Sequence, residues 1–238
     1  MRTLALLLLS ACGSGTWVVE TWGEDYIEAG IPAADFADGC ALTYDKFEVT
    51  FTEVWLIDGN DEQAAALDAP FVIDLTEPGP TELGRADVKP NSYDTVHMRI
   101  APDAGAPSVI AEGTLTCDGE AKTFAWAFDT DTTYGCEPDE LSIAAGGEDR
   151  SQLTIHGDHL WYDSLSAEDA EVRGQHIAAA DADDDDVITQ AELAAVPVAP
   201  TGLDVGPYST VTDLGAYVRF LTQTVGHIDG EGHCQVDL

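Results

Sequence analysis

Six candidate ligands for a hard cation are spaced through residues 181–192 of this 238-residue chain. Carboxylates stand at the first, third, fifth and twelfth places of that segment, a hydroxyl stands at the ninth, and the seventh offers its backbone carbonyl. Hard cations such as Ca²⁺ bind about six to eight oxygen atoms, and this spacing lets one loop wrap its oxygens around a single ion. The predicted ligands are Asp181, Asp183, Asp185, Val187, Thr189 and Glu192.

The same segment resembles the calcium-binding loop of the EF-hand family, in its acidic spacing and in Ile188 at the eighth place. The resemblance implies that Glu192 binds the ion with both carboxylate oxygens, that Ile188 holds the loop through a short β contact, and that a helix flanks each side. The segment departs from the family at the sixth place, where Asp186 replaces Gly. The turn there needs a positive φ, which Asp adopts less readily than Gly. A solvated run of like charges is the alternative interpretation.

Two short motifs contain four of the six histidines, and both are interleaved with glycine and carboxylate residues. Imidazole and carboxylate groups suit Zn²⁺ and Cu²⁺, so the motifs would form a transition-metal site if they met in space. The protein would then be a Zn²⁺- or Cu²⁺-binding protein or a metalloenzyme. Histidines that hydrogen-bond to the backbone of glycine turns are the alternative. The candidate ligands are His156, His159, His227 and His233.

The charge balance limits the classes of partner. Nine Lys and Arg residues stand against 45 Asp and Glu residues, which gives a formal net charge of −36. A chain this acidic is repelled by nucleic acids and by anionic membrane surfaces, and it attracts divalent cations. The sequence contains no Gly-x-Ser-x-Gly element of a hydrolase, so we expect a binding or structural module rather than an enzyme. No particular protein partner is indicated.

Residues 1–11 have the layout of a signal peptide, with a short basic start and an apolar run that is too short to span a bilayer. The four residues Leu-Ser-Ala-Cys that end at Cys12 resemble the lipobox of bacterial lipoproteins. That resemblance implies a lipid on Cys12 and an extracytoplasmic protein held at the bacterial outer membrane or cell surface through this lipid alone. Glycine and serine make residues 12–16 a predicted tether. A buried N-terminal strand is the alternative.

The four remaining cysteines predict two disulfides, because an even number of cysteines in an oxidising compartment is normally paired. Three pairings are possible. We favour Cys117–Cys136, which bracket a predicted hairpin, together with Cys40–Cys234, which would join the two ends of the chain.

Strand signals dominate residues 17–163. Alternating apolar residues in 41–57 and 93–100 indicate strands with one buried face. An Asp-Gly pair at 118–119, between two such runs, predicts a hairpin over 112–128, with Phe124, Trp126 and Phe128 on one face of its second strand. About seven or eight strands separated by turn signals predict a domain that is an antiparallel sandwich or is barrel-like.

Helical signals follow the strands. Residues 164–200 are predicted to form an EF-hand-like helix-loop-helix, with an alanine-rich helix over 170–180 and a short helix over 190–196. Residues 201–238 are predicted to form a helix and tail that pack on the β domain. The predicted fold class is therefore mainly β, with a C-terminal α-helical segment that carries the acidic loop.

Overall fold

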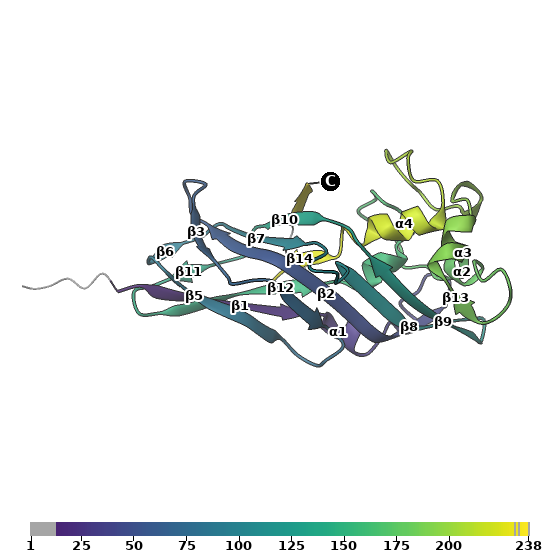
Figure 1. Ribbon diagram of the computed structural model, residues 1–238, viewed down its shortest axis with the longest axis horizontal. Coiled ribbons are helices and arrows are strands. Elements are labelled where there is room, and N and C mark those ends of the chain that lie inside the picture. Colours follow the sequence, from purple (N-terminus) through teal and green to yellow (C-terminus); the bar gives the residue numbers. More distant parts are fainter. Residues whose placement is uncertain (1–12, 231, 233, 238) are drawn as a thin grey trace, which may run out of the picture.

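The computed structural model describes residues 13–230, 232 and 234–237, and over this range the protein is mainly β. In the same range two large sheets make up most of the molecule, and α2, α3 and α4 gather at one end (Figure 1). The predicted β-rich fold is confirmed, and the arrangement is consistent with a sandwich. The predicted signal peptide and Cys12 lie outside the described residues.

The smaller of these sheets has four strands in the described part of the chain. Their order is β14 (Gly226–Ile228), β12 (Glu148–Ile155), β1 (Gly15–Trp22) and β5 (Thr81–Val88). Strands β1 and β12 run parallel, whereas the other neighbours are antiparallel, so this sheet departs from the predicted antiparallel arrangement at one pair of strands. Two parallel strands cannot be joined by a tight turn and need a long connection. Between β1 and β12 the chain forms most of the strands of the other sheet.

Strand β1 begins earlier than the sequence predicts. Gly15 pairs with Val88 and Thr16 pairs with Glu148, so both residues belong to the sheet and not to the predicted 12–16 tether. The backbone groups of this segment hydrogen-bond to β5 on one side and to β12 on the other. These hydrogen bonds order the segment even though glycine would leave it flexible on its own.

The larger sheet has nine strands among the described residues, and β2 (Ala41–Ile57) is the longest of them. Its main path is β13 (Val187–Ile188), β9 (Glu120–Phe128), β8 (Val109–Cys117), β2, β7 (Thr95–Ile100), β10 (Thr132–Cys136) and β15 (Cys234–Asp237). Strands β3 (Gln63–Ala66) and β4 (Phe71–Asp74) pair with β2, and β6 (Asn91–Ser92) pairs separately with β11 (Ser142–Ile143). The predicted hairpin is confirmed by β8 and β9, whose turn has φ values of 52° at Asp118 and 86° at Gly119.

The hydrophobic core is continuous from the sheets to the helical end. Phe124, Trp126 and Phe128 alternate along the buried face of β9, as the sequence pattern predicts. On β14, a Cβ at Gly226 would lie 2.6 Å from Cε of Met98 on β7. Glycine therefore permits the close approach of the two sheets at this point.

The helices are short. They are α1 (Glu24–Glu28), η1 (Asp158–Trp161), α2 (Gln175–Ala178), α3 (Gln190–Ala195), η2 (Ala199–Thr201) and α4 (Leu214–Leu221), where η marks a 3₁₀ helix. Helix α3 occupies the predicted range, and α4 begins after Asp213, whose carboxylate accepts a hydrogen bond from the Ala216 amide at 2.8 Å. Within the described residues, no helix has the length and apolar character needed to cross a membrane.

The helix predicted over 170–180 is much shorter, because only α2 is helical there. Val172 pairs with Tyr162 in an isolated β bridge. Oδ2 of Asp38 accepts hydrogen bonds from the amides of Gly174 and Gln175, both at 2.8 Å, and this external cap sets the start of α2. Tertiary partners thus take the backbone groups that an alanine-rich helix would have used.

The predicted formation of two disulfides is confirmed for the described residues, but the favoured pairing is wrong. The bonds are Cys40–Cys117 and Cys136–Cys234. Antiparallel pairing of β2 with β8 brings the start of one strand beside the end of the other, and Cys136 on β10 faces Cys234 on β15. Strands β2 and β7 separate β8 from β10, which keeps Cys117 away from Cys136. The two bonds indicate an oxidising, extracytoplasmic environment.

Candidate metal centres

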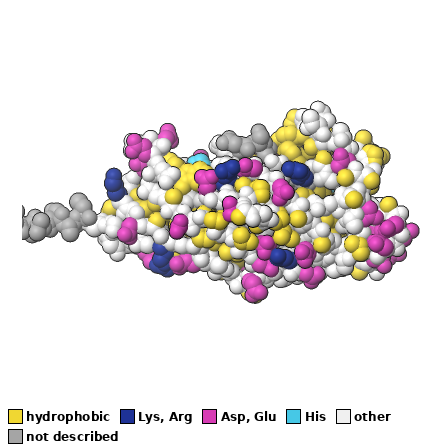
Figure 2. Space-filling view, in the orientation of Figure 1, with side chains coloured by type: hydrophobic (Ala, Val, Ile, Leu, Met, Phe, Trp, Pro, Cys, Tyr) yellow, Lys and Arg dark blue, Asp and Glu magenta, His cyan; other side chains and the backbone are white. Residues whose placement is uncertain are grey.

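The first candidate centre is the acidic loop, residues 181–192, which joins α2 to α3. Acidic side chains gather at the end of the molecule that carries β13 and α3 (Figure 2). Carboxylate oxygens of Asp181, Asp183 and Asp185 lie within 4.8 Å of one another. The spacing read from the sequence therefore does bring three of the six predicted ligands together around one point.

Hydrogen bonds within the loop hold this arrangement. The Asp181 carboxylate accepts the amides of Asp185 and Asp186, both at 3.2 Å, and the Asp185 carboxylate accepts the amide of Val187 at 3.0 Å. The backbone has a φ of 57° at Asp184 and 64° at Asp186. The prediction that the sixth place adopts a positive φ is confirmed, and an aspartate occupies a conformation that favours glycine.

Glu192, the predicted closing ligand, links the two ends of the loop. Its Oε1 accepts the amide of Ala182 at 3.0 Å, and its Oε2 accepts the amide and hydroxyl of Thr189 at 2.9 and 2.8 Å. The Thr189 hydroxyl in turn accepts the Glu192 amide at 3.2 Å, which completes a capping box at the start of α3. These bonds lower the pKa of Glu192, because they favour the ionised carboxylate.

The loop is fastened to the larger sheet through β13. Val187 pairs with Thr123 and Ile188 pairs with Phe124, both in a parallel register. Ile188 is fully buried, and its carbonyl accepts a hydrogen bond from Nε1 of Trp126 at 2.8 Å. The expected β contact at Ile188 is confirmed, and its partner is a strand of the sandwich.

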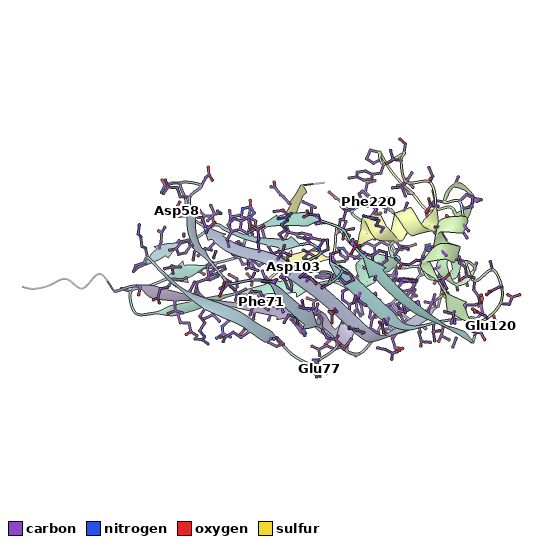
Figure 3. The ribbon with its side chains drawn as sticks, viewed as in Figure 1. Asp58, Phe71, Glu77, Asp103, Glu120 and Phe220 are labelled. Carbon is purple, nitrogen blue, oxygen red and sulfur yellow. A yellow bond between two sulfur atoms is a disulfide. The ribbon has the colours of Figure 1, made fainter. Side chains whose placement is uncertain are left out.

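Charge in the loop is only partly neutralised. Nζ of Lys122 on β9 bonds to Oδ2 of Asp181, and this bond lowers the pKa of that carboxyl. The neighbouring charge of Asp185 has the opposite effect on Asp183, whose pKa is raised. A pocket of about 390 Å³ beside the loop is lined partly by Lys122, Asp181 and Glu120, and Figure 3 labels Glu120 at this end of the molecule. A bound cation would relieve the repulsion among these carboxylates.

The second candidate centre is a histidine cluster on the smaller sheet. The ring centroids of His156 and His227 are 4.3 Å apart, those of His159 and His227 are 5.0 Å apart, and those of His156 and His159 are 5.3 Å apart. Strands β12 and β14 are neighbours, and Thr154 pairs with His227, so sheet pairing brings the two motifs together. The fourth candidate, His233, lies outside the described residues.

Two carboxylates that were not predicted as ligands join the histidines. Oδ1 of Asp158 lies 3.8 Å from Nδ1 of His156, and Oε2 of Glu24 lies 3.7 Å from Nε2 of the same ring. Ligand atoms of His156, Asp158 and His159 all fall within 4.8 Å of one another. The His-Gly-Asp-His motif already contained Asp158, whereas nothing in the sequence linked the distant Glu24 to it.

A buried aromatic network fixes the segment that carries these groups. Nε1 of Trp161, in η1, donates to the Tyr44 hydroxyl at 2.8 Å, and that hydroxyl donates to the Gly157 carbonyl at 2.7 Å. A Cβ at Gly157 would lie 2.6 Å from a side-chain carbon of Ile27, so the chain passes too close for a larger residue. These two hydrogen bonds hold η1, which carries Asp158 and His159, against the hydrophobic core.

The surroundings of His159 favour its neutral imidazole. His156 is 5% exposed and Asp158 is 7% exposed. Burial lowers the pKa of His159 well below its usual value, and the neighbouring His227 and His156 lower it further. A neutral imidazole keeps a lone pair, which is the form that binds a metal ion.

No protein family, curated protein or solved structure matches the chain.

Proposed function

We propose that this protein is an extracytoplasmic calcium-binding module, in which the acidic loop holds one Ca²⁺ and thereby braces the fold. The observation that carries the proposal is the convergence of the Asp181, Asp183 and Asp185 carboxylates at EF-hand spacing. The remaining ligands are the Val187 carbonyl and the side chains of Thr189 and Glu192, which complete an oxygen-only set of the kind that Ca²⁺ prefers.

A structural role fits the attachment of the loop better than a sensor role. The loop pairs with β9 through Ile188, and α3 packs on α4, so the ion would join the sheet to the helical end. An ion that binds only the folded state stabilises it by mass action. Extracellular calcium sites commonly have dissociation constants of roughly 10⁻⁴ to 10⁻³ M, and we expect this range here.

We further propose that Cys12 carries a lipid that holds the protein at the bacterial outer membrane or cell surface. The Leu-Ser-Ala-Cys motif and the oxidising environment indicated by the disulfides support this location. Replacing Cys12 by Ser is expected to abolish incorporation of labelled fatty acid and to release the protein from the membrane fraction. Continued fatty-acid labelling of the variant would overturn the anchor.

Calorimetric titration with Ca²⁺ tests the calcium site. Asp183→Asn removes a ligand carboxylate that has no lysine partner, and it is expected to weaken binding by about tenfold or more, since the charge count of the ligands sets the affinity. Asp184→Asn is the matched control, because it removes the same charge from the same loop at a place that supplies no ligand. We expect the control to change the affinity by less than about threefold through long-range attraction alone.

Two results would contradict the calcium site. One is the absence of Ca²⁺ binding at millimolar concentration. The other is an equal loss of affinity in Asp183→Asn and Asp184→Asn, which would show that the segment attracts ions only as a solvated acidic run.

A further inference from the structure

The protonation of His159 follows from its neighbour Thr224. The Thr224 hydroxyl has one proton, and it donates that proton to the Leu221 carbonyl at 2.9 Å. Its oxygen lies 3.1 Å from Nδ1 of His159, so towards the ring it is an acceptor and Nδ1 carries the hydrogen. The lone pair of the neutral ring is then on Nε2. Such a bond to the far nitrogen is the usual means of fixing a metal-binding tautomer.

The carboxylate of Asp158 is oriented in a similar way. The Tyr162 hydroxyl donates to Oδ2 at 3.0 Å, and the ring of Tyr162 packs against that of His159 at a centroid distance of 4.5 Å. Oδ1 faces Nδ1 of His156 at 3.8 Å, a distance too long for a hydrogen bond. One oxygen thus accepts the Tyr162 hydroxyl, and the other faces His156.

His156 completes the set. Its Nε2 lies 3.4 Å from the Gly230 carbonyl, which accepts its hydrogen, and 3.7 Å from Oε2 of Glu24. A hydrogen on Nε2 leaves the lone pair on Nδ1, the nitrogen that faces Asp158.

We propose that Nδ1 of His156, Oδ1 of Asp158 and Nε2 of His159 form a binding site for Zn²⁺. Two imidazoles and one carboxylate are a ligand set that this ion accepts in proteins. One ligand atom from each of these three residues already lies within 4.8 Å of the others, and bonds of about 2.0–2.2 Å would draw the ligand atoms further inward. The site is separate from the acidic loop and does not depend on calcium binding there.

Three protein ligands leave a fourth position for water or another small ligand, as in zinc sites that are not purely structural. A pocket of about 260 Å³ is lined by His159 and Tyr162, so one proposed ligand borders a surface cavity. The ring of His227 packs on both ligand imidazoles, with centroid distances of 4.3 Å to His156 and 5.0 Å to His159.

Titration of the chelator-treated protein with Zn²⁺ tests the site, with millimolar Ca²⁺ present to occupy the acidic loop. The unaltered protein is expected to bind one Zn²⁺ more tightly than micromolar, and Co²⁺ is expected to give the visible absorption of a low-symmetry histidine site. His159→Gln and Asp158→Asn are expected to abolish both signals. His97→Gln is the matched control, because His97 stacks on Trp55 in the other sheet and is expected to change neither signal.

Tyr162→Phe keeps all three ligands and removes only the hydroxyl that orients Asp158. It is expected to weaken Zn²⁺ binding by about tenfold and to alter the Co²⁺ spectrum, since such supporting contacts contribute about 10- to 100-fold to metal affinity. It therefore decides the question even if a ligand variant fails to fold. Absence of stoichiometric Zn²⁺ binding by the unaltered protein, or Zn²⁺ binding that is unchanged in either His159→Gln or Tyr162→Phe, would overturn the proposal.

Discussion

Nζ of Lys122 lies 2.5 Å from Oδ2 of Asp181, so the first residue of the acidic loop is already paired with a positive charge from the larger sheet. The Asp181 side chain is fully buried, and that of Lys122 is 13% exposed. The pair fastens the loop to β9 at a second point, beside the backbone pairing of β13. In this position the ammonium group competes with any cation for the same carboxylate.

Lys122→Met is expected to have opposite effects on calcium affinity and on metal-free stability. Loss of the competing charge raises the Ca²⁺ affinity, by about threefold to tenfold, because the ion then meets one more uncompensated carboxylate. The melting temperature without Ca²⁺ falls, because Asp181 stays buried without its partner. Calorimetry and thermal melts measure the two effects. Lys46→Met, which breaks the partly exposed pair with Glu48, is the control. A lower Ca²⁺ affinity in Lys122→Met would contradict this explanation.

Asp186→Gly is expected to stabilise the protein. The residue has a φ of 64°, a conformation in which a side chain is unfavourable by roughly 1 kcal/mol, so glycine should raise the free energy of unfolding by up to that amount. Asp186→Asn removes the same charge and keeps a side chain, so the difference between the variants in urea denaturation isolates the backbone effect. Equal stability of the two variants would show that the backbone there is not strained.

Removing the Cys40–Cys117 bond by a double alanine substitution is expected to lower the free energy of unfolding by about 4 kcal/mol, because the closed loop spans 77 residues. Urea denaturation measures the loss. Mapping of peptides under non-reducing conditions checks the pairing, and a peptide that joins Cys117 to Cys136 would contradict it.

His176, in α2, is expected to make the protein less stable below neutral pH. Burial lowers its pKa from 6.5 to about 4, against the opposing charges of Asp38 and Asp163. The unfolded chain therefore takes up the proton first, and the contribution of His176, which is fully present above about pH 6.5, is lost as the pH falls towards 4. His176→Asn should reduce the drop in melting temperature between pH 7 and pH 4.5, whereas His97→Gln should not. An unchanged drop in His176→Asn would exclude this residue as the cause.

The features predicted correctly from the sequence depend on residues close together in the chain. Asp118 and Gly119 specify a turn, alternating aromatic residues specify the buried face of β9, and the spacing of aspartates in 181–192 brings their carboxylates together. Each is determined by backbone preferences or side-chain periodicity over a few residues, and so it is visible without the rest of the fold.

The tertiary structure alone decided which distant segments meet. Sheet order determined the partners of Cys40 and Cys136, the neighbouring positions of β12 and β14 joined the histidine motifs, and a cap from Asp38 shortened the predicted helix. The pairing of β13 with β9 likewise placed Lys122 beside Asp181. Pairing between strands that are a hundred residues apart depends on the packing of the whole core and on the entropy of closing long loops. Neither can be inferred from a sequence pattern of a few residues.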